Sequence, residues 1–434
     1  MFGMAYGLTT SGNNLEKKNL SRPRLIFLTQ YYDPEPAYKG QVFAEALCDL
    51  GYDVEVVTGF PNYPDGKTYE GYCIRLLQRS ESNGIKITRL PLFPSHSGSK
   101  VGRIANYVTF MLSAFLYLSF FAKNSSLIYV YNPPLTVGLA ATASRIFRRR
   151  TPVIVDVHDL WPDTLAATGM LSNPSVLAII GRVADWMYSR VQFIILHTHG
   201  FRSKLLERGV VEECMETVIG WTNEYPQTES RQDVAEGLAG LPGLKLLYAG
   251  NIGPAQALDA VVEAAAILQR DGNGELASFC FMGAGVSRDG LLRRTKELEL
   301  SNVFFLPHVT PDEVGVYLHA ADALLVHLRA DPLFAITLPS KTQAYMYSGK
   351  PLIMACHGEA SRLIESARAG VIAMPENPES IAEAVTNLAL LPEFERYAMG
   401  ERAREYYMRE LSMDKGMDRF DKIFKSVLNK FNMA

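Results

Sequence analysis

The sequence predicts an α/β fold made of two doubly wound domains, and three observations support this prediction. The chain has 434 residues, and at about 100–200 residues per domain this length favours two domains. Short apolar runs that indicate strands alternate with longer stretches whose apolar residues recur at helical spacing. The strand candidates are continuously apolar rather than alternating, as in a parallel sheet that helices cover on both faces.

The first half of the chain contains repeated strand and helix patterns. Residues 24–29 (RLIFLT) form a short apolar run, and residues 42–58 (VFAEALCDLGYDVEVVT) continue with a helical and then a second strand pattern. We expect a first domain over residues 22–225. Residues 1–21 are rich in Gly, Asn and Ser and lack the features of a signal peptide, so we expect a disordered tail there. The further strand candidates of this half are residues 85–90, 126–131, 153–158 and 193–198.

A change in composition separates the two halves. Residues 222–243 are polar and rich in Gly, Pro and Glu, as expected for a linker. The strand and helix patterns then start again and define a second domain over residues 226–411. From about residue 395 the chain reads as helix, with a final helix at about 412–434. The strand candidates of the second half begin with LKLLYAGNIG (244–253) and continue at residues 278–285, 303–307, 323–328, 351–355 and 371–374.

Charge and cysteine content exclude several classes of protein. The 43 Lys and Arg residues against 46 Asp and Glu residues leave a net charge of −3, so we expect no nucleic-acid partner, and any anion site must be local. The five widely spaced cysteines contain no Cys-x-x-Cys pair, which indicates neither a disulfide framework nor a zinc site. No Asp-x-Asp pair occurs, so the usual carboxylate seat for a divalent ion that carries a diphosphate is missing, and we expect no metal.

Glycine-bearing loops follow two strands of the second half. Ligands of doubly wound sheets bind outside the carboxyl ends of the strands. Residues 250–256 (GNIGPAQ) follow a strand and precede a helix, where small residues let backbone N–H groups approach a phosphate. A tight turn that needs glycine for its geometry is an equal alternative. Gly283 and Gly285 follow the next strand, but the next glycine is Gly290, so a dinucleotide-binding fingerprint is not supported.

Two further segments carry groups suited to chemistry. In VDVHDLWPDTL (155–165), His158, Asp159 and Trp161 crowd the loop after a strand; histidine is suited to hydrogen bonding or proton sharing, and tryptophan offers a ring face to a sugar. In residues 329–351, Ser340 fits a helix N-cap and Lys341 stands in the first turn. Lysine there opposes the helix dipole unless an anion binds, which makes Lys341 a candidate diphosphate ligand rather than a surface lysine.

Together these segments resemble the family 4 glycosyltransferases of the GT-B fold. Within that family they resemble a bacterial subgroup, including N-acetylfucosamine transferases, that builds O-antigen and capsule repeat units. The resemblance covers residues 24 to about 410. Its matching motifs are Tyr32-Asp33-Pro34-Glu35 with Gly40, Pro61-Asn62-Tyr63-Pro64, His158-Asp159-Leu160-Trp161-Pro162, Gly250-Asn251-Ile252-Gly253 with Gln256, and Pro339-Ser340-Lys341 with Tyr345 and Gly349-Lys350-Pro351.

The resemblance implies two Rossmann-like domains facing a cleft, with the final helix crossing back to the first domain. It implies metal-independent transfer of a sugar, with retained configuration, from a nucleotide diphosphate sugar (UDP-sugar favoured) to an acceptor, without a cofactor. Its catalytic candidates are His158, Asp159 and Lys341. Its donor-side candidates are Gly250, Asn251, Gly253, Gln256, Gly283, Gly285, Arg329, Pro339 and Ser340. Its acceptor-side candidates are Tyr32, Glu35, Gly40, Asn62 and Trp161.

The chain departs from the family pattern at four positions. Where most members have an Arg and a Lys that contact the diphosphate, this chain has Asn251 and Gln256. Where many have a pair of glutamates, it has Ile336 and Ala344. We infer that Lys341 and nearby Arg329 replace the lost positive charge. The alternatives are a non-catalytic nucleotide-sugar-binding subunit of a polysaccharide assembly complex and, on a related two-domain fold, a nucleotide-sugar epimerase.

One apolar run is unusual for a soluble protein. No charge occurs between Arg103 and Lys123, and the eighteen residues from Ile104 to Phe121 can span roughly 30 Å as a helix, the thickness of a bilayer core. A spanning helix would place half of the first sheet on each side of a membrane, which leaves a buried crossover helix or a helix in the membrane interface. We favour the interface and expect a peripheral or monotopic protein on the cytoplasmic face of the inner membrane. Residues 104–122 would contact the lipid, and the acceptor would be a lipid-linked saccharide. Nearby cations for anionic lipid are Lys100, Arg103, Arg145, Arg148, Arg149 and Arg150.

Overall fold

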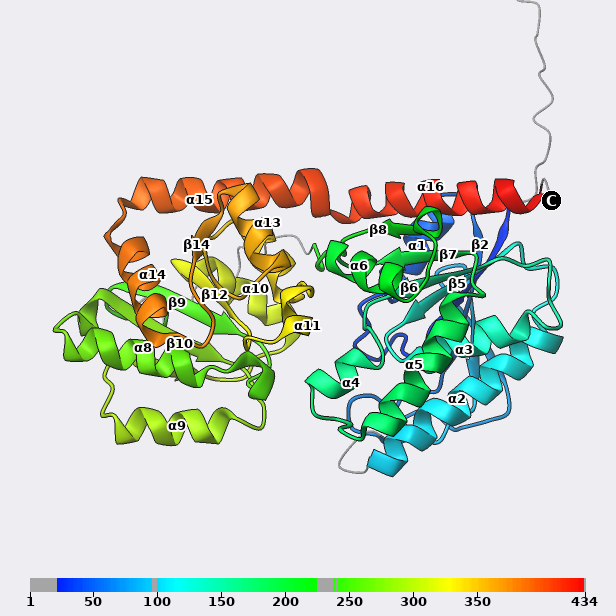
Figure 1. Ribbon diagram of the computed structural model, residues 1–434, viewed down its shortest axis with the longest axis horizontal. Helices are drawn as coiled ribbons and strands as arrows, with labels where there is room; N and C mark the ends of the chain where they lie inside the picture. Colours follow the sequence, from blue (N-terminus) through cyan, green and yellow to red (C-terminus); the bar gives the residue numbers. More distant parts are fainter. Residues whose placement is uncertain (1–21, 96–99, 225–236, 239, 433–434) are drawn as a thin grey trace, which may run out of the picture.

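A computed structural model describes residues 22–95, 100–224, 237–238 and 240–432 of the chain. The chain forms two α/β domains side by side, joined along one edge by long C-terminal helices (Figure 1). This architecture confirms the prediction of two doubly wound domains. The tail expected at residues 1–21, and much of the linker expected at 222–243, lie outside the described residues.

The first domain is built on an eight-stranded sheet in the order β3-β4-β2-β1-β5-β6-β7-β8. Neighbouring strands are parallel except β3 and β4, which are antiparallel. The strands are β1 (Arg24–Leu28), β2 (Asp53–Gly59), β3 (Gln78–Ser82), β4 (Ile85–Leu90), β5 (Leu127–Asn132), β6 (Val153–Val157), β7 (Phe193–Leu196) and β8 (Met215–Thr217). The helices are α1 (Gln41–Asp49), α2 (Lys100–Phe120), α3 (Leu135–Ser144), α4 (Asp163–Ala167), α5 (Pro174–Tyr188) and α6 (His199–Glu207).

The second domain is built on a six-stranded parallel sheet in the order β11-β10-β9-β12-β13-β14. The strands are β9 (Leu244–Ala249), β10 (Ala277–Met282), β11 (Val303–Leu306), β12 (Ala323–His327), β13 (Leu352–Ala355) and β14 (Gly370–Ile372). The helices are α8 (Asp259–Arg270), α9 (Arg288–Glu297), α10 (Pro311–Ala320), α11 (Pro332–Ala335), α12 (Lys341–Tyr347), α13 (Glu359–Ala367), α14 (Pro378–Leu390), α15 (Glu393–Tyr406) and α16 (Met413–Asn432).

The uncharged run forms α2, which joins β4 to β5 within one sheet. Phe110, Ala114 and Leu118 are fully buried against the domain core, so α2 is an integral crossover helix. Its other side is exposed, with Leu112 at 52% and Leu116 at 51%. By length and composition alone, Val101–Phe120 is long and apolar enough to cross a membrane, and 28% of its most apolar window is buried. The sequence alternatives of a buried and an exposed helix therefore each describe one side of α2.

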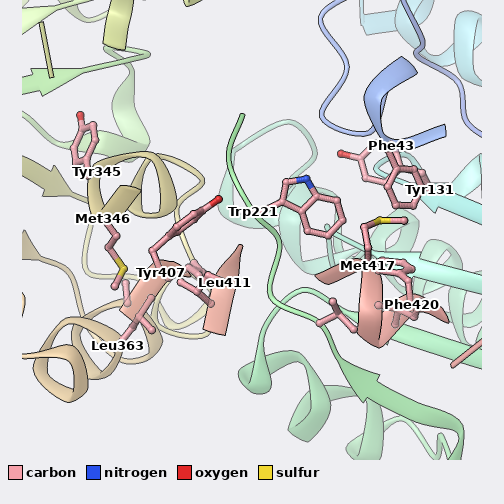
Figure 2. Close-up of a cluster of buried hydrophobic side chains, with 14 of the residues drawn as sticks. Phe43, Tyr131, Trp221, Tyr345, Met346, Leu363, Tyr407, Leu411, Met417 and Phe420 are labelled. Carbon is pink, nitrogen blue, oxygen red and sulfur yellow. The ribbon is translucent and has the colours of Figure 1, made fainter. Parts of the chain in front are cut away.

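The C-terminal helices link the two domains. α15 lies along the second domain and α16 along the first (Figure 1). Figure 2 shows the junction, where Tyr407 and Leu411 lie with residues of the second domain and Met417 and Phe420 with residues of the first. The Tyr407 hydroxyl donates to Glu224 (2.6 Å), and the backbone N–H of Met413 donates to the same carboxylate (2.7 Å). The two segments that cross between the domains are thus bonded to each other.

Candidate active site

A cleft of about 630 Å³ lies between the two domains, at the carboxyl ends of both sheets. Doubly wound sheets bind ligands in this position because the loops after parallel strands meet there. Residues of the first domain that line it are Tyr38, Asp159, Thr164, Thr168, Phe201, Trp221, Thr222 and Asn223. Polar and small residues of the second domain that line it are Gly250, Asn251, Gln256, Thr337, Pro339, Ser340, Lys341 and Tyr345.

Lys341 is the one cation among the described residues that line the cleft. Its Nζ is buried, makes no hydrogen bond within the described part of the chain, and lies 3.6 Å from the centre of the Tyr248 ring. Burial lowers the pKa of Lys341 to about 7. A side chain at Gly250 would place its Cβ 3.2 Å from Nζ, so the glycine leaves room above the amine. An unpartnered buried amine beside a backbone loop is suited to bind an anion.

Ser340 precedes α12 as expected, but its side chain makes no capping hydrogen bond and its backbone is already helical. α12 has only seven residues, so its dipole contributes less to anion binding than we expect from the sequence. The position of Lys341 depends instead on burial. Tyr345 on the same helix donates its hydroxyl to the carbonyl of Ala249 (3.0 Å) and accepts from the N–H of Ala249 (2.8 Å). This pair of bonds fixes the end of β9 beside Lys341.

The two glycine loops pack directly on each other. A Cβ at Gly283, whose φ is +139°, would lie 1.9 Å from the carbonyl oxygen of Gly250, so only glycine fits there. Gly285 lies similarly close to Ile252. Gln256 accepts from the N–H of Gly253 (3.1 Å) and from the side chain of Asn251 (3.2 Å). Asn251 and Gln256 thus hold the loop in shape, and the loop forms one wall of the cleft.

Arg329 does not line the cleft, contrary to the inference that it joins Lys341 in replacing the missing cations. Its guanidinium donates to the carbonyl of Pro254 (3.1 Å) and lies 4.0 Å from Glu376. Its side chain is 48% exposed. The inference relied on the short distance from Lys341 along the sequence, but the contacts with Pro254 and Glu376 hold the guanidinium outside the cleft lining.

His158 and Asp159 leave β6 in different directions. Asp159 lines the cleft, and burial raises the pKa of its carboxyl, while His158 partly opposes that rise. His158 packs 4.5 Å from the ring of His197 and 4.8 Å from that of Tyr131. Its Nε2 lies 3.3 Å from Oδ1 of Asp156. His197, which the sequence analysis did not single out as a site residue, is therefore a packed partner of His158.

The acceptor-side candidates support the loops of the first domain rather than line the cleft. Tyr32, Glu35 and Asn62 are almost fully buried. The Tyr32 hydroxyl donates to Gln41 (2.6 Å), and the Glu35 carboxylate accepts from the backbone N–H groups of Asn62 (2.7 Å) and Tyr63 (2.8 Å). These three side chains therefore do not reach the cleft, where an acceptor would bind.

Gly40 and Trp161 also have local roles. A Cβ at Gly40 would lie 2.2 Å from an oxygen of Asp33. The same oxygen accepts from the backbone N–H of Gln41, the first residue of α1. Trp161 packs edge-on against Tyr107 of α2, with ring centres 6.4 Å apart. The tryptophan therefore connects the loop that carries Asp159 to α2, the helix with one exposed apolar side.

Glu359 connects the two domains beside the cleft. Its carboxylate, on the first turn of α13, accepts from the backbone N–H groups of His199 (3.1 Å) and Gly200 (2.7 Å) at the start of α6. The Thr198 hydroxyl also donates across the interface, to the carbonyl of Ile336 (2.7 Å). A carboxylate at a helix N-terminus is favourable because it pairs with free N–H groups and with the helix dipole.

We expect Glu359→Gln to loosen this contact. Hydrogen bonds to a charged group contribute about 1.5–3 kcal/mol, so exchange of the Gly200 amide with deuterium should become at least about tenfold faster. Glu365→Gln, on the exposed side of the same helix, is the matched control and should leave that exchange rate unchanged. Equal exchange in both variants would contradict a cross-domain role for Glu359.

Tyr38, Lys39 and Asp156 are among the residues near the site that the sequence analysis missed. Tyr38 lines the cleft and donates its hydroxyl to the carbonyl of Trp221 (2.6 Å). Lys39 and Asp156 form a buried ion pair behind His158. Asp156 is a polar residue inside the apolar run 153–157, and that contrast was an available signal. Lys39 and Tyr38 carried no comparable signal in their loop.

Comparisons with known proteins agree along most of the chain. Residues 41–219 match the family described as Glycosyl transferase 4-like domain, and residues 233–406 match Glycosyl transferases group 1. A protein of Escherichia coli (strain K12), WcaI, whose name describes it as a glycosyl transferase of colanic acid biosynthesis, is 25% identical over 417 residues. That match covers 90% of this chain and 96% of the relative.

Two solved structures share the two-domain fold. Alr3699/HepE of Anabaena, in complex with UDP, superposes with a TM-score of 0.64 at 14% identity, over 93% of this chain and 100% of that chain. WaaG, a glycosyltransferase involved in lipopolysaccharide biosynthesis, superposes with a TM-score of 0.62 at 16% identity, over 92% and 99%. At these identities the likeness concerns the fold.

Proposed function

Because this chain belongs to the family 4 glycosyltransferases of the GT-B fold, we propose that it transfers a sugar from a nucleotide diphosphate sugar to a lipid-linked saccharide. The reaction retains the anomeric configuration, needs no metal ion or cofactor, and serves bacterial surface polysaccharide synthesis of the O-antigen or capsule kind. Within the family we place the chain with the N-acetylfucosamine transferase-like members. The donor is a UDP-sugar; Alr3699/HepE, which shares the fold, has been solved in complex with UDP-glucose.

The observation that carries the donor proposal is the unpartnered amine of Lys341 inside the cleft between the domains. A departing diphosphate develops negative charge, and a fixed cation in a desolvated site stabilises it more than one in water. The 250–256 loop forms the wall of the cleft beside the same amine, but the backbone N–H groups of Gly250, Ile252, Gly253 and Gln256 already donate within the protein. Asn251 and Gln256 replace the family's cations, so Lys341 carries the positive charge of this site alone among the described lining residues.

On the other wall, Asp159 brings a carboxylate to the cleft from the loop after β6, and His158 is the residue before it. Retention places the incoming hydroxyl on the face from which the diphosphate leaves. The diphosphate oxygens held by Lys341 can then accept the acceptor's proton, and His158 hydrogen-bonds the donor sugar. Among the described residues, no group of three or more His, Cys, Asp and Glu side chains is placed to hold a metal ion.

Donor binding should weaken as the pH rises through neutrality. The pKa of Lys341 in the free protein is about 7, and only the protonated amine attracts the diphosphate. Above that pKa the affinity for a nucleotide sugar, whose diphosphate has no further proton to lose, should fall by about tenfold per pH unit. Calorimetric titration at pH 6 and pH 8.5 measures this. In Lys341→Met the affinity should no longer depend on pH in this range, which distinguishes the amine from the titration of Asp159. An equal pH dependence in both proteins would contradict the role of the Lys341 amine in donor binding.

The acceptor proposal rests on an exposed apolar and cationic surface of the first domain. Residues 100–155 contain seven Lys and Arg residues and no Asp or Glu, in a chain whose net charge is −3. α3 packs against both α2 and α5 on one side of the sheet (Figure 1). The exposed apolar residues of these helices recur at helical spacing: Val101, Ile104, Val108, Leu112, Leu116 and Phe120 on α2, and Val176, Ile179, Val183 and Trp186 on α5.

This surface fits the interface of an anionic bilayer. An interfacial helix buries an apolar side in the headgroup region while basic residues attract anionic lipid. α5 adds a second apolar stripe that the sequence analysis did not assign. Tyr107 of α2 packs on Trp161, next to the loop that brings Asp159 to the cleft. We therefore place the protein on the cytoplasmic face of the inner membrane, bound through α2, α5 and the arginines at 145–150.

The experiment that tests this function measures release of nucleoside diphosphate from UDP- and GDP-sugars, with and without membrane extract that contains lipid-linked saccharides. The proposal requires release that depends on the acceptor, with the sugar recovered on lipid. Binding of nucleotide sugar without release would indicate a non-catalytic subunit. Conversion of the nucleotide sugar to an epimer without acceptor would indicate an epimerase.

A further inference from the structure

A charged cluster lies behind His158, in the core of the first domain. Lys39 and Asp156 form an ion pair through Nζ and Oδ2, with side chains 2% and 1% exposed. The hydroxyl of Tyr129 donates to the same Oδ2 (2.5 Å), and Nζ of Lys39 donates to that hydroxyl (2.9 Å). Oδ2 of Asp156 therefore already accepts from two donors.

The other oxygen of Asp156 faces the histidine. Oδ1 lies 3.3 Å from Nε2 of His158. Nδ1 of His158 makes no hydrogen bond within the described part of the chain. Burial by itself raises the pKa of Asp156, but Lys39 and then His158 more than offset this effect and hold that pKa below its usual range. Asp156 is thus a fixed anion whose free oxygen can only accept from His158.

Lys39 is held by aromatic rings from four parts of the fold. Phe43 of α1, Tyr129 and Tyr131 of β5, and Trp221 after β8 lie within 5.7 Å of Nζ. The ring of Phe420 on α16 lies nearest, at 4.2 Å. Cation–π contacts of this kind replace part of the lost hydration of a buried amine. The C-terminal helix therefore closes the enclosure that keeps the ion pair in place.

We propose that Lys39, Tyr129 and Asp156 are positioning residues that fix the proton of His158 on Nε2 and leave Nδ1 as the ring nitrogen available to substrate. The inference rests on the proposed glycosyltransferase function. An acceptor-only carboxylate selects the imidazole tautomer that donates to it, because the other tautomer would set two lone pairs against each other. The same kind of carboxylate contact orients the histidine of a serine protease triad.

A single substitution can reverse this arrangement. In Asp156→Asn, Lys39 and Tyr129 still require an acceptor at the Oδ2 position, so the amide nitrogen must occupy the Oδ1 position. That nitrogen donates to Nε2 of His158 and forces the proton onto Nδ1. Asp156→Asn leaves a buried cation with a neutral partner, so the double variant Lys39→Met/Asp156→Asn is made in parallel. In the double variant only Tyr129 contacts the amide, and its hydroxyl can donate or accept, so this variant reports the stability of the fold without the buried cation rather than the tautomer.

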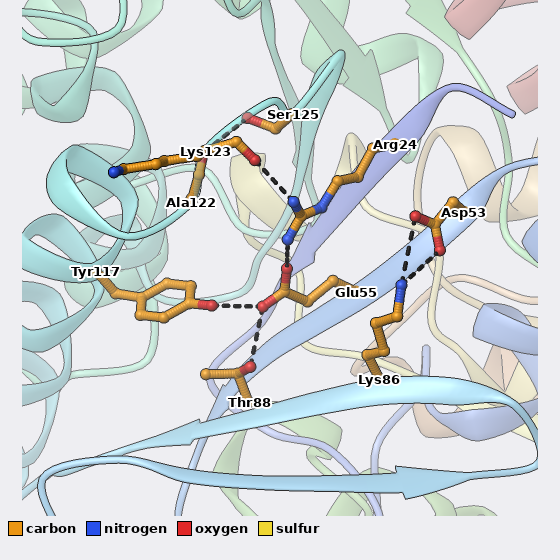
Figure 3. A network of polar contacts seen from close by, with 9 residues as sticks. All are labelled: Arg24, Asp53, Glu55, Lys86, Thr88, Tyr117, Ala122, Lys123 and Ser125. Atoms are coloured by element: carbon orange, nitrogen blue, oxygen red, sulfur yellow. Dashed lines mark hydrogen bonds and ion pairs between the residues drawn. The ribbon is translucent and has the colours of Figure 1, made fainter. Parts of the chain in front are cut away.

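The matched control is a second buried carboxylate in the same sheet. Glu55 accepts from Arg24 (2.6 Å), Tyr117 (2.5 Å) and Thr88 (2.9 Å) (Figure 3), and none of the histidines that the structure describes contacts it. Its side chain is 5% exposed. Glu55→Gln therefore removes a comparable buried anion that also has a tyrosine and a cation as partners. It reports how far a loss of stability of the first domain by itself lowers kcat.

Two measurements test the proposal. Long-range ¹H–¹⁵N correlation spectra, with His158→Gln for assignment, report which ring nitrogen carries the proton in the ligand-free protein. We expect Nε2–H in the wild type and Nδ1–H in Asp156→Asn. In steady-state kinetics we expect Asp156→Asn to lower kcat by about 10²- to 10⁴-fold with KM for the nucleotide sugar unchanged, and Glu55→Gln to leave kcat near the wild-type value.

The positioning role is overturned if the wild type carries Nδ1–H, or if the proton stays on Nε2 in Asp156→Asn. It is also overturned if Asp156→Asn loses no more kcat than Glu55→Gln. The tautomer spectra need no substrate. A chain that transfers no sugar would thus contradict the proposed function while the spectra still decide the tautomer assignment.

Discussion

Replacing Lys341 by Met or Ala lowers kcat for sugar transfer by about 10²- to 10³-fold, the expected loss when one preorganised charge at a leaving group is removed. The amine is buried, unpartnered, and lies against the Tyr248 ring. Met keeps the apolar contact and removes only the charge, so the folded state should be at least as stable as the wild type. Single-turnover kinetics with saturating nucleotide sugar measure the chemical step directly.

Arg329→Met is the matched control for this experiment. Arg329 is the other cation inferred from the sequence, but its guanidinium is directed to Pro254 and Glu376. Its removal should change kcat by less than about threefold, since exposed ion pairs contribute little. Wild-type turnover in Lys341→Met would contradict the role of Lys341. A large loss in Arg329→Met would show that the loop after β12 rearranges when the donor binds.

Binding to anionic vesicles should fall by about 10²-fold when three exposed cations are neutralised. Lys123, Arg149 and Arg150 are exposed, and each basic residue near an anionic surface contributes about 1 kcal/mol. The variant Lys123→Gln/Arg149→Gln/Arg150→Gln is measured by co-sedimentation with phosphatidylglycerol-containing vesicles. Wild-type binding should weaken between 0.1 M and 1 M salt as the Debye length falls from about 10 Å to about 3 Å.

The apolar part of the surface is tested separately. Leu112→Asn/Leu116→Asn places polar groups on the exposed side of α2 and should also reduce vesicle binding. Leu390→Asn/Phe394→Asn is the matched control, because these residues are 70% and 71% exposed on the second domain. Equal binding to neutral and anionic vesicles, or equal loss in the α2 and control variants, would contradict the bilayer assignment.

The fold could be predicted because its strands are apolar on both faces. A continuous run such as residues 127–131 has few alternatives to a buried parallel strand. β3 was missed because its sequence, QRSES, is polar and mostly exposed and its backbone pairs only with β4. β8 was missed because it has three residues. Both are edge strands, where pairing is local and the sequence carries little hydrophobic signal.

The site could be predicted only where a motif follows a strand or begins a helix. The 250–256 loop was found in the first way, and Lys341 was found from its place in the first turn of a helix; both line the cleft. Lys39 and Asp156 are 117 residues apart, and an ion pair at that separation produces no recognisable spacing in the sequence. Glu359 binds the backbone of another domain, and the sequence does not show which N–H groups a carboxylate will meet. Pairings of this kind are set by the tertiary arrangement alone.

The position of Phe420 has a consequence for how the first domain folds during synthesis. Domains generally fold in order as the ribosome releases them, from the N-terminus onward. Here the ring nearest to the buried amine of Lys39 is on α16, which is translated only after the whole second domain. Until then the emerging first domain exposes Phe43 and Tyr129, which α16 later covers. A gene fragment that ends at the linker therefore encodes an unfinished core rather than a separable domain.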